Sequence, residues 1–319
     1  MKIRTSVTKN IMAIFREDKK NIFYLLYYSA IEAILVLSIP LASSFIINSI
    51  LAHANISIVV LSIVVIIVFL LTTSLQILKE YIIEKFQQKI FLTTSIKIAK
   101  MATDFKSSSL ETKKLIDKYM NYFFDIGAIQ KFFPVLLLDG SGLVVKVIAS
   151  LLLLLAFDPI LFGLGFFFFI SFVVIIIVLG INGPKYAIKR SDAKHSSIYF
   201  IQNIPFDERE DKETYKELDA QLSSYIDMRI KSFRVTISQL SLTFFTEGAI
   251  FSTFLIIGGN LVIKGVLPVG EFIAAEIVVV SMTSAIKSFI KHIDYVYDMI
   301  EGFYKIEKLS ALLSEQKNG

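Results

Sequence analysis

IVVLSIVVIIVFLL occupies Ile58–Leu71, and FFFFISFVVIIIVL occupies Phe166–Leu179. Both stretches are apolar around the whole circumference of a helix, whereas a surface helix of a soluble protein is apolar along one stripe only. Each belongs to a longer apolar segment that reaches the ~20 residues a helix needs to cross the hydrocarbon core of a bilayer. The sequence therefore predicts an all-α membrane protein with six spans: Ile22–Ile50, Ile56–Leu78, Phe132–Phe157, Ile160–Ile181, Val235–Ile263 and Val269–Ile290.

The composition agrees with a membrane protein. Hydrophobic residues make up 55% of the 319 residues, and the mean hydropathy is +0.66. The net charge of +5 comes from basic residues spread over the ends of the predicted spans. A nucleic-acid binder would gather such residues in a patch interleaved with aromatics, so nucleic acid is not an expected partner. The chain has no cysteine, which excludes disulfides, iron–sulfur centres and thiol catalysis.

The distribution of lysine and arginine predicts the orientation of the spans. All but two of the 33 basic residues lie before the first span, in the two long connections, or at and beyond the end of the sixth span. The exceptions are Lys146, inside the third span, and Lys264, in the last short connection. Because basic segments stay on the cytoplasmic side of a membrane, both termini and both long connections are predicted to be cytoplasmic.

The two long connections are predicted to be helical stalks that continue the membrane helices without interruption. Glu80–Phe105 and Tyr215–Ser241 both carry apolar residues at three-to-four spacing, with polar residues between them. Breaks are expected only at two tips, Lys106–Thr112 and Asn203–Asp207, the second of which contains Pro205. The spaced apolar residues are Ile82, Ile83, Phe86, Ile90, Phe91 and Ile98 in the first stalk, and Leu218, Leu222, Ile226, Ile230 and Phe233 in the second.

The connections on the other side of the membrane are short. They comprise His53–Asn55, Asp158–Pro159 and Lys264–Pro268. Pro40 lies deep inside the first span, where it is expected to kink the helix rather than unwind it. Secondary carriers tend to show internal repeats and helices broken near the membrane midplane. Long cytoplasmic helices with tight external turns instead indicate a protein that engages a cytoplasmic partner.

In this order, the segments resemble the transmembrane domain of ABC exporters of the six-helix, domain-swapped type, over nearly the whole chain. The last external turn, KGVLPVGEF at Lys264–Phe272, is similar to the family's turn into its sixth helix. The ending at Tyr304–Glu315 is similar to the family's exit toward its ATPase domain, and Tyr122–Pro134 is similar to peptide and toxin secretion exporters. An amphipathic segment before the first span resembles the family's elbow helix, with Val7, Ile11, Ile14 and Phe15 as its apolar residues.

The resemblance implies an elbow at 1–20, a six-helix domain at 21–313, and a linker at 314–319 that leads toward an ATPase domain. It also implies a coupling helix at each tip, near Ser108–Lys118 at the first and Ile198–Phe206 at the second, which docks on an ATPase domain. The first tip departs from the family's usual Gly-Asp or Gly-Glu opening, because Ser109-Leu110-Glu111 stands there. The implied coupling residues are Ser109, Leu110, Glu111, Lys113 and Lys114 in the first tip, and Ile198, Tyr199, Phe200, Gln202 and Phe206 in the second.

The chain is not expected to be an enzyme, and no catalytic residue is assigned. A nucleotide site needs a loop that ends in Gly-Lys-Ser/Thr, and this tripeptide does not occur. Asp139-Gly140-Ser141-Gly142 lies inside an apolar span and is interpreted as a site of close helix packing. ATP and magnesium are therefore expected in a fused or separate ATPase domain, with no cofactor in this chain. His53, His195 and His292 are scattered, so no metal site is predicted.

Ionisable residues inside the spans are candidates for function, because they are costly to place in a membrane. Lys146 is expected to pair with a carboxylate from another helix, with Glu247 and Glu276 as the likeliest partners, and to share a lining with Asp139. Two interpretations remain open: a structural ion pair, or a pathway for a polar cargo. The excess of carboxylates favours a cationic or peptide-like cargo. The translocation candidates are Glu32, Asp139, Lys146, Glu247 and Glu276.

The resemblance implies an exporter half that pairs with a second copy or a homologous half-transporter in a bacterial inner membrane. Its fourth and fifth helices would cross to the partner, and the cargo, which is unidentified, would pass by alternating access. Other functions remain open. One is a regulatory membrane subunit without transport, and another is a secondary carrier driven by an ion gradient. An intramembrane enzyme would require Asp139, Glu247 and Glu276 to converge.

Overall fold

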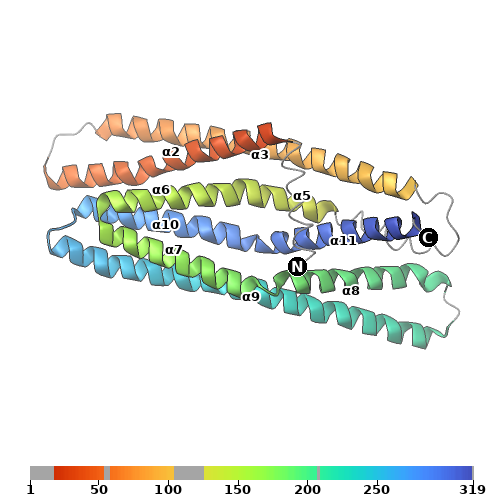
Figure 1. Ribbon diagram of the computed structural model, residues 1–319. Coiled ribbons are helices and arrows are strands. Elements are labelled where there is room, and N and C mark those ends of the chain that lie inside the picture. The colour runs from red at the N-terminus through yellow and green to blue at the C-terminus, as the bar shows by residue number, and fades with distance from the viewer. Residues whose placement is uncertain (1–17, 54–57, 104–125, 207–208, 318–319) are drawn as a thin grey trace.

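The computed structural model describes residues 18–53, 58–103, 126–206 and 209–317 (Figure 1). All regular structure in these residues is helical. The elements are α2 (Lys19–Leu51), α3 (Ile58–Thr103), α5 (Ile126–Pro134), the π-helix η2 (Val135–Gly140), α6 (Ser141–Phe157), α7 (Pro159–Gly180), α8 (Gly183–Asn203), the 3₁₀ turn η3 (Ile204–Phe206), α9 (Asp211–Ile263), α10 (Val269–Lys291) and α11 (Ile293–Lys317).

Among the described residues, six helical segments, called columns here, are long and apolar enough to span a membrane, which confirms the predicted membrane protein. The columns run side by side in one elongated bundle. The last residues of α2, α6 and α9 lie at one end, called the turn end here, and α5, α8 and α11 lie at the other, the stalk end (Figure 1). The helix α2 passes through Pro40 without a break, as expected.

The turn end is built from residues that cap helices and allow close packing. The Asp158 carboxylate caps α7 by accepting from the Ile160 N–H at 2.7 Å, and Pro159 takes the first helical position. Gly265 ends α9 in the left-handed conformation, at φ +72°, which favours glycine. The Gly270 N–H donates to Asn48 Oδ1 at 2.9 Å, and a Cβ at this glycine would collide with the backbone of α2. The last short connection thereby fixes α10 against α2.

The two stalks that were predicted to be uninterrupted lie in continuous helices, whereas three other columns have interruptions that were not predicted. The helices α3 and α9 have 46 and 53 residues without a break. In contrast, η2 lies between α5 and α6, Ile181–Asn182 separate α7 from α8, and His292 separates α10 from α11. These interruptions lie close together, since Asp139 of η2 is 3.3 Å from His292. The physical reason includes Pro134, which lacks an N–H and so weakens the helix just before η2.

The second interruption depends on two glycines that bring the end of α7 close to α11. A Cβ at Gly180 would lie 2.7 Å from the Tyr297 hydroxyl, and one at Gly183 would overlap the Tyr297 ring. The Tyr297 hydroxyl donates to Gln239 Oε1 at 3.0 Å, and Gln239 Nε2 donates to the Ile176 carbonyl at 3.1 Å. A buried hydrogen-bond chain therefore links α7, α9 and α11 where the stalks begin.

The apolar stripes of the two continuous stalks have different surroundings. In α3, the stripe is buried in an aromatic core at the stalk end, where Phe86 is 1% exposed. Other members of that core are Leu25, Ile83, Ile90, Phe132, Phe133, Leu137, Met299 and Phe303. In α9, the stripe is exposed, and Ile226 has an exposed fraction of 50%. The stalk of α9 instead packs on its own chain through polar side chains, including Thr214 and Ser232.

The predicted division of the chain is only partly visible. Most of the elbow at 1–20 lies outside the described residues, and so does the whole first tip. The break predicted at Asn203–Asp207 is confirmed in its described part by η3, since Ile204–Phe206 form a short turn between α8 and α9. The helix α11 continues to Lys317, past the predicted boundary at 313.

Candidate functional site

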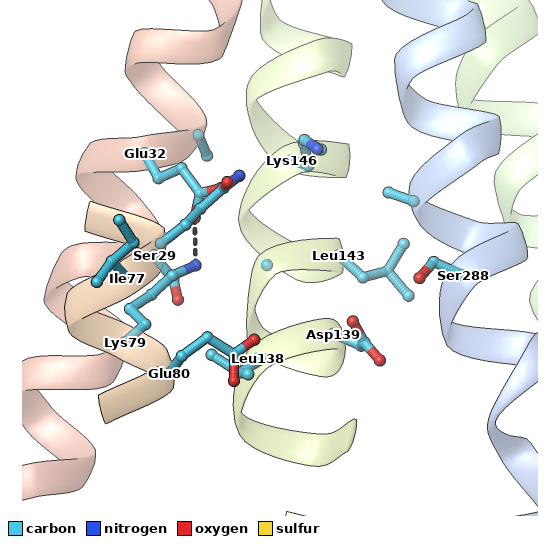
Figure 2. Close-up of a pocket in the computed structure, with 14 residues that line it drawn as sticks. Ser29, Glu32, Ile77, Lys79, Glu80, Leu138, Asp139, Leu143, Lys146 and Ser288 are labelled. Carbon is cyan, nitrogen blue, oxygen red and sulfur yellow. Dashed lines mark hydrogen bonds and ion pairs between the residues drawn. The ribbon is translucent and has the colours of Figure 1, made fainter. Parts of the chain in front are cut away.

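A charged cavity of about 500 Å³ lies among α2, α3, the η2–α6 column and α10. Its volume is within the range of small-molecule sites, which is roughly 300–1,000 Å³. Figure 2 shows Glu32, Lys79 and Glu80 on α2 and α3 to one side of the η2–α6 column, while Asp139 and Leu143 point from that column toward α10. The lining comprises Ser29, Glu32, Ala33, Gln76, Ile77, Lys79, Glu80, Leu138, Asp139, Gly142, Leu143, Lys146, Ala285 and Ser288.

Glu32 is held by two donors from α3. Its Oε2 forms an ion pair with Lys79 Nζ, and its Oε1 accepts from Gln76 Nε2 at 2.8 Å. Lys79 is only 5% exposed, so the pair is shielded from water. Removing one partner from such a pair is expensive, because the other charge is left buried without compensation. The ion pair therefore fastens α2 to α3 and uses both charges.

Lys146 has no ion pair with another residue in the part of the chain that the structure describes. The predicted pairing with Glu247 or Glu276 is wrong. Glu247 pairs with Lys287 at 3.0 Å, and Lys287 also lies 4.6 Å from the centre of the Phe244 ring. The prediction assumed that Lys146 is the only cation deep inside the membrane. The long side chain of Lys287, near the end of a span, reaches the Glu247 carboxylate. Glu247 therefore already has a partner.

Asp139 and Lys146 line the same cavity, which confirms the expected shared lining. Asp139 belongs to η2, and its Oδ2 lies 3.3 Å from His292 Nδ1 at the α10–α11 interruption. The neighbouring glycines behave differently from each other. A Cβ at Gly140 would touch the Phe289 ring at 3.4 Å, whereas Gly142 faces open space at the cavity. The packing interpretation of this segment therefore holds for Gly140 and for Ser141, whose hydroxyl donates to Ser29 Oγ of α2 at 3.1 Å, but not for Gly142.

Glu276 lies apart from the cavity, toward the turn end of α10. Both of its carboxylate oxygens are buried without a hydrogen bond to any described residue. The structure thus brings Glu32, Asp139 and Lys146 together, and leaves Glu247 and Glu276 outside that group. Asp139, Glu247 and Glu276 do not converge on one cavity, as an intramembrane enzyme would require.

Sequence reasoning missed several residues of this site. Gln76, Lys79 and Glu80 lie where the second predicted span passes into its stalk, and none of them was predicted to be a site residue. Their signal is a spacing of three to four, which places Gln76 beside both Lys79 and Glu80 on one side of α3. Ser288 gave no signal, because a single serine near the end of a span is common.

The second tip presents apolar side chains at the stalk end. Phe206 is 82% exposed, and Ile201 is also exposed. Ile198, Tyr199 and Phe200 are half-buried, and Gln202 is exposed. The Arg209 guanidinium lies 5.8 Å from the centre of the Phe200 ring and pairs with Glu217 at the start of α9. The first-tip residues Ser109, Leu110, Glu111, Lys113 and Lys114 lie outside the described residues.

The site combines one buried ion pair with a cation and carboxylates that remain available to a ligand. Charged and hydrogen-bonding groups of this kind can bind a polar molecule. A group of three or more metal-binding side chains is not found among the described residues. Comparison with known proteins does not identify the chain: no protein-family model matches it, and no curated protein is significantly similar to it.

Proposed function

We propose that this chain is the membrane-spanning half of an ATP-driven exporter of the six-helix ABC type, with its stalk end in the cytoplasm of a bacterial cell. The observation that carries the proposal is α9, which runs without a break from the second tip to the last connection at the turn end. Its 53 residues are about 80 Å long at ~1.5 Å per residue, more than twice the ~30 Å hydrocarbon core. A displacement at the tip is therefore carried directly into the membrane.

The exposed stripe on α9 supports assembly with a second copy of the chain. Leu222, Ile226 and Ile230 recur every four residues, so they lie along one side of the helix and line a shallow groove on it. Asp219 and Asp227 border this groove. An apolar stripe with a charged border is typical of a helix that packs against another helix. Beyond the membrane such a stripe is unfavourable in water, and a second copy covers it in the proposed exporter.

The second tip supports docking of an ATPase domain. Exposed apolar side chains at a protein surface mark interaction sites, and Phe206 is the most exposed of those at this tip. The tip is joined to α9 within a few residues, so a domain bound here pushes on the longest helix of the chain. ATP and magnesium bind in that domain, and the cavity alternates between the two sides of the membrane.

A photo-crosslinking residue at Phe206, introduced in the organism of origin, tests the docking step. The expected result is a crosslink to a polypeptide that also binds an ATP analogue, and the crosslink yield changes when ATP is added. The matched control places the same residue at His53, an exposed position at the turn end, where no ATP-binding polypeptide is captured. Transport that follows an ion gradient, together with no ATP-binding partner at Phe206, would contradict the proposal and favour a secondary carrier.

A further inference from the structure

We infer that the cavity binds an extended zwitterion, with its anionic group at Lys146 and its cationic group about 10 Å along the same helical column at Asp139, in a cavity that Glu80 of α3 also lines. This inference rests on the proposed function for its physiological meaning, because the bound molecule would be the cargo. The binding itself requires neither ATP nor a partner.

Some of the charged side chains that line the cavity are paired within the protein, and the others are left to bind a ligand. Five ionisable residues line the cavity, and two of them, Glu32 and Lys79, neutralise each other. Gln76 satisfies the second oxygen of Glu32. The cavity is left with one cation, Lys146, and two carboxylates, Asp139 and Glu80. Neither Lys146 nor Glu80 has an ion pair with another described residue, and Asp139 faces only His292 among them.

The remaining charges are separated along the cavity. Asp139 and Lys146 are seven residues apart on one column, which corresponds to two helical turns and about 10 Å along its axis. Lys146 lies farther toward the turn end, while Asp139 and Glu80 lie nearer the stalk end, as Figure 2 shows. A molecule that enters from the stalk end therefore meets the carboxylates first and the lysine last.

Classes of ligand differ in how well their charges match these remaining side chains. A simple anion placed at Lys146 would leave Glu80 without a counter-charge in a partly shielded site, and Asp139 with only His292 beside it. A simple cation would leave Lys146 unpaired and repelled. A zwitterionic lipid head group carries its two charges close together and does not span two helical turns. A short extended peptide can span two helical turns. An extended chain rises ~3.3–3.6 Å per residue, so the charges at the two ends of a peptide of roughly four residues are about 10 Å apart.

Isothermal titration calorimetry of the purified full-length chain in lipid nanodiscs tests this inference with tetra-alanine as the probe. We expect saturable binding of tetra-alanine, with at least ~10-fold weaker binding of its C-terminal amide and of its N-acetyl form. Di-alanine, whose charges are too close together, also binds more weakly. Equal affinity for all four molecules, tight binding of octanoate, or no saturable binding of tetra-alanine would overturn the inference.

Variants assign the two charged groups. Lys146→Gln is expected to weaken tetra-alanine binding at least ~10-fold and to leave the weak binding of the amide unchanged. Lys146→Arg keeps the charge and retains binding, which separates recognition from a folding defect. Lys264→Gln, at an exposed position in the last connection, is the matched control and retains binding. If binding fails while the ATP-dependent crosslink at Phe206 persists, this inference is wrong and the proposed function stands. The reverse result leaves a peptide-binding membrane protein that is not ATP-driven.

Discussion

The stalks of α3 and α9 carry similar apolar stripes, yet the chain buries one and leaves the other exposed. The α3 stripe packs on α5 and α11 around Phe86 and Phe133, whose ring centres are 5.2 Å apart. The α9 stripe faces outward, and α9 contacts its own chain through polar side chains such as Gln239, which accepts a hydrogen bond from Tyr297. The α3 stripe thus belongs to the core of the chain, whereas the α9 stripe is exposed, and in the exporter that we propose a second copy covers it.

Truncation of Phe86 should give the largest effect on stability. Phe86→Ala removes a fully buried ring and leaves a cavity beside Phe133, so the free energy of unfolding should fall by about 3–5 kcal/mol. Equilibrium unfolding in detergent micelles measures this loss. The matched variant is Phe233→Ala on α9, whose side chain is exposed and whose loss should leave the monomer's stability unchanged within ~0.5 kcal/mol. Equal losses in both variants would abolish the distinction between the stalks.

Substitution of Gln239 should have the next largest effect, because it breaks the polar contact of α9 with its own chain. Gln239→Met leaves the buried Tyr297 hydroxyl without its acceptor, which should cost about 1–3 kcal/mol of unfolding free energy. Adding Tyr297→Phe removes the unpaired hydroxyl and should restore most of that loss. A double variant that is as unstable as the two single losses combined would show that this hydrogen bond does not matter.

A charge in the α9 stripe should disturb assembly and leave the fold intact. Ile226→Glu places a carboxylate in the stripe, and we expect dimerisation in nanodiscs to weaken at least ~10-fold, while the monomer's unfolding changes by less than ~0.5 kcal/mol. Molecular mass measured by light scattering at several concentrations gives the dissociation constant. Ser224→Glu adds the same charge two residues away, at an exposed position outside the stripe, and should have no effect on dimerisation.

The exposed ion pairs beside the stripe should matter least. Lys231 Nζ lies 2.7 Å from Asp227 Oδ2, four residues earlier on α9, and both side chains are largely exposed. Exposed pairs of this spacing contribute about 0.3–0.5 kcal/mol. Lys231→Ala should therefore change the unfolding free energy by no more than this amount. A loss above ~1 kcal/mol would mean that α9 depends on its charged residues more than on its stripe.

Periodicity and hydropathy were sufficient to predict the helical membrane fold, because a span that is apolar on all sides has few alternatives in water. They also predicted the stripe on α3 and the break at Pro205. They did not predict the interruptions at η2, Ile181–Asn182 and His292, since these depend on contacts such as the packing of Tyr297 against Gly183. The sequence around each interruption does not show which residue of another helix packs against it.

The site was predicted in part for the same reason. Glu32, Asp139 and Lys146 were found because an ionisable residue in a span stands out against apolar neighbours. The lysines that pair with carboxylates in the spans were not predicted. Lys79 and Lys287 lie at the ends of spans, and the direction in which each side chain extends to Glu32 or Glu247 depends on the folded structure. Which of the two stripes the chain leaves exposed was also beyond the sequence, since α3 and α9 have similar periodicity.

Labelling of single cysteines tests the central claim most directly, because the chain has no cysteine of its own. Ile226→Cys and Ser224→Cys are each placed in the purified chain in nanodiscs that hold two copies, and their rates of reaction with a maleimide are compared. We predict that Ile226→Cys reacts at least ~10-fold more slowly than Ser224→Cys, and that the difference disappears in nanodiscs with one copy. Equal rates in both preparations would show that the α9 stripe is not covered by a second copy, and would contradict the account.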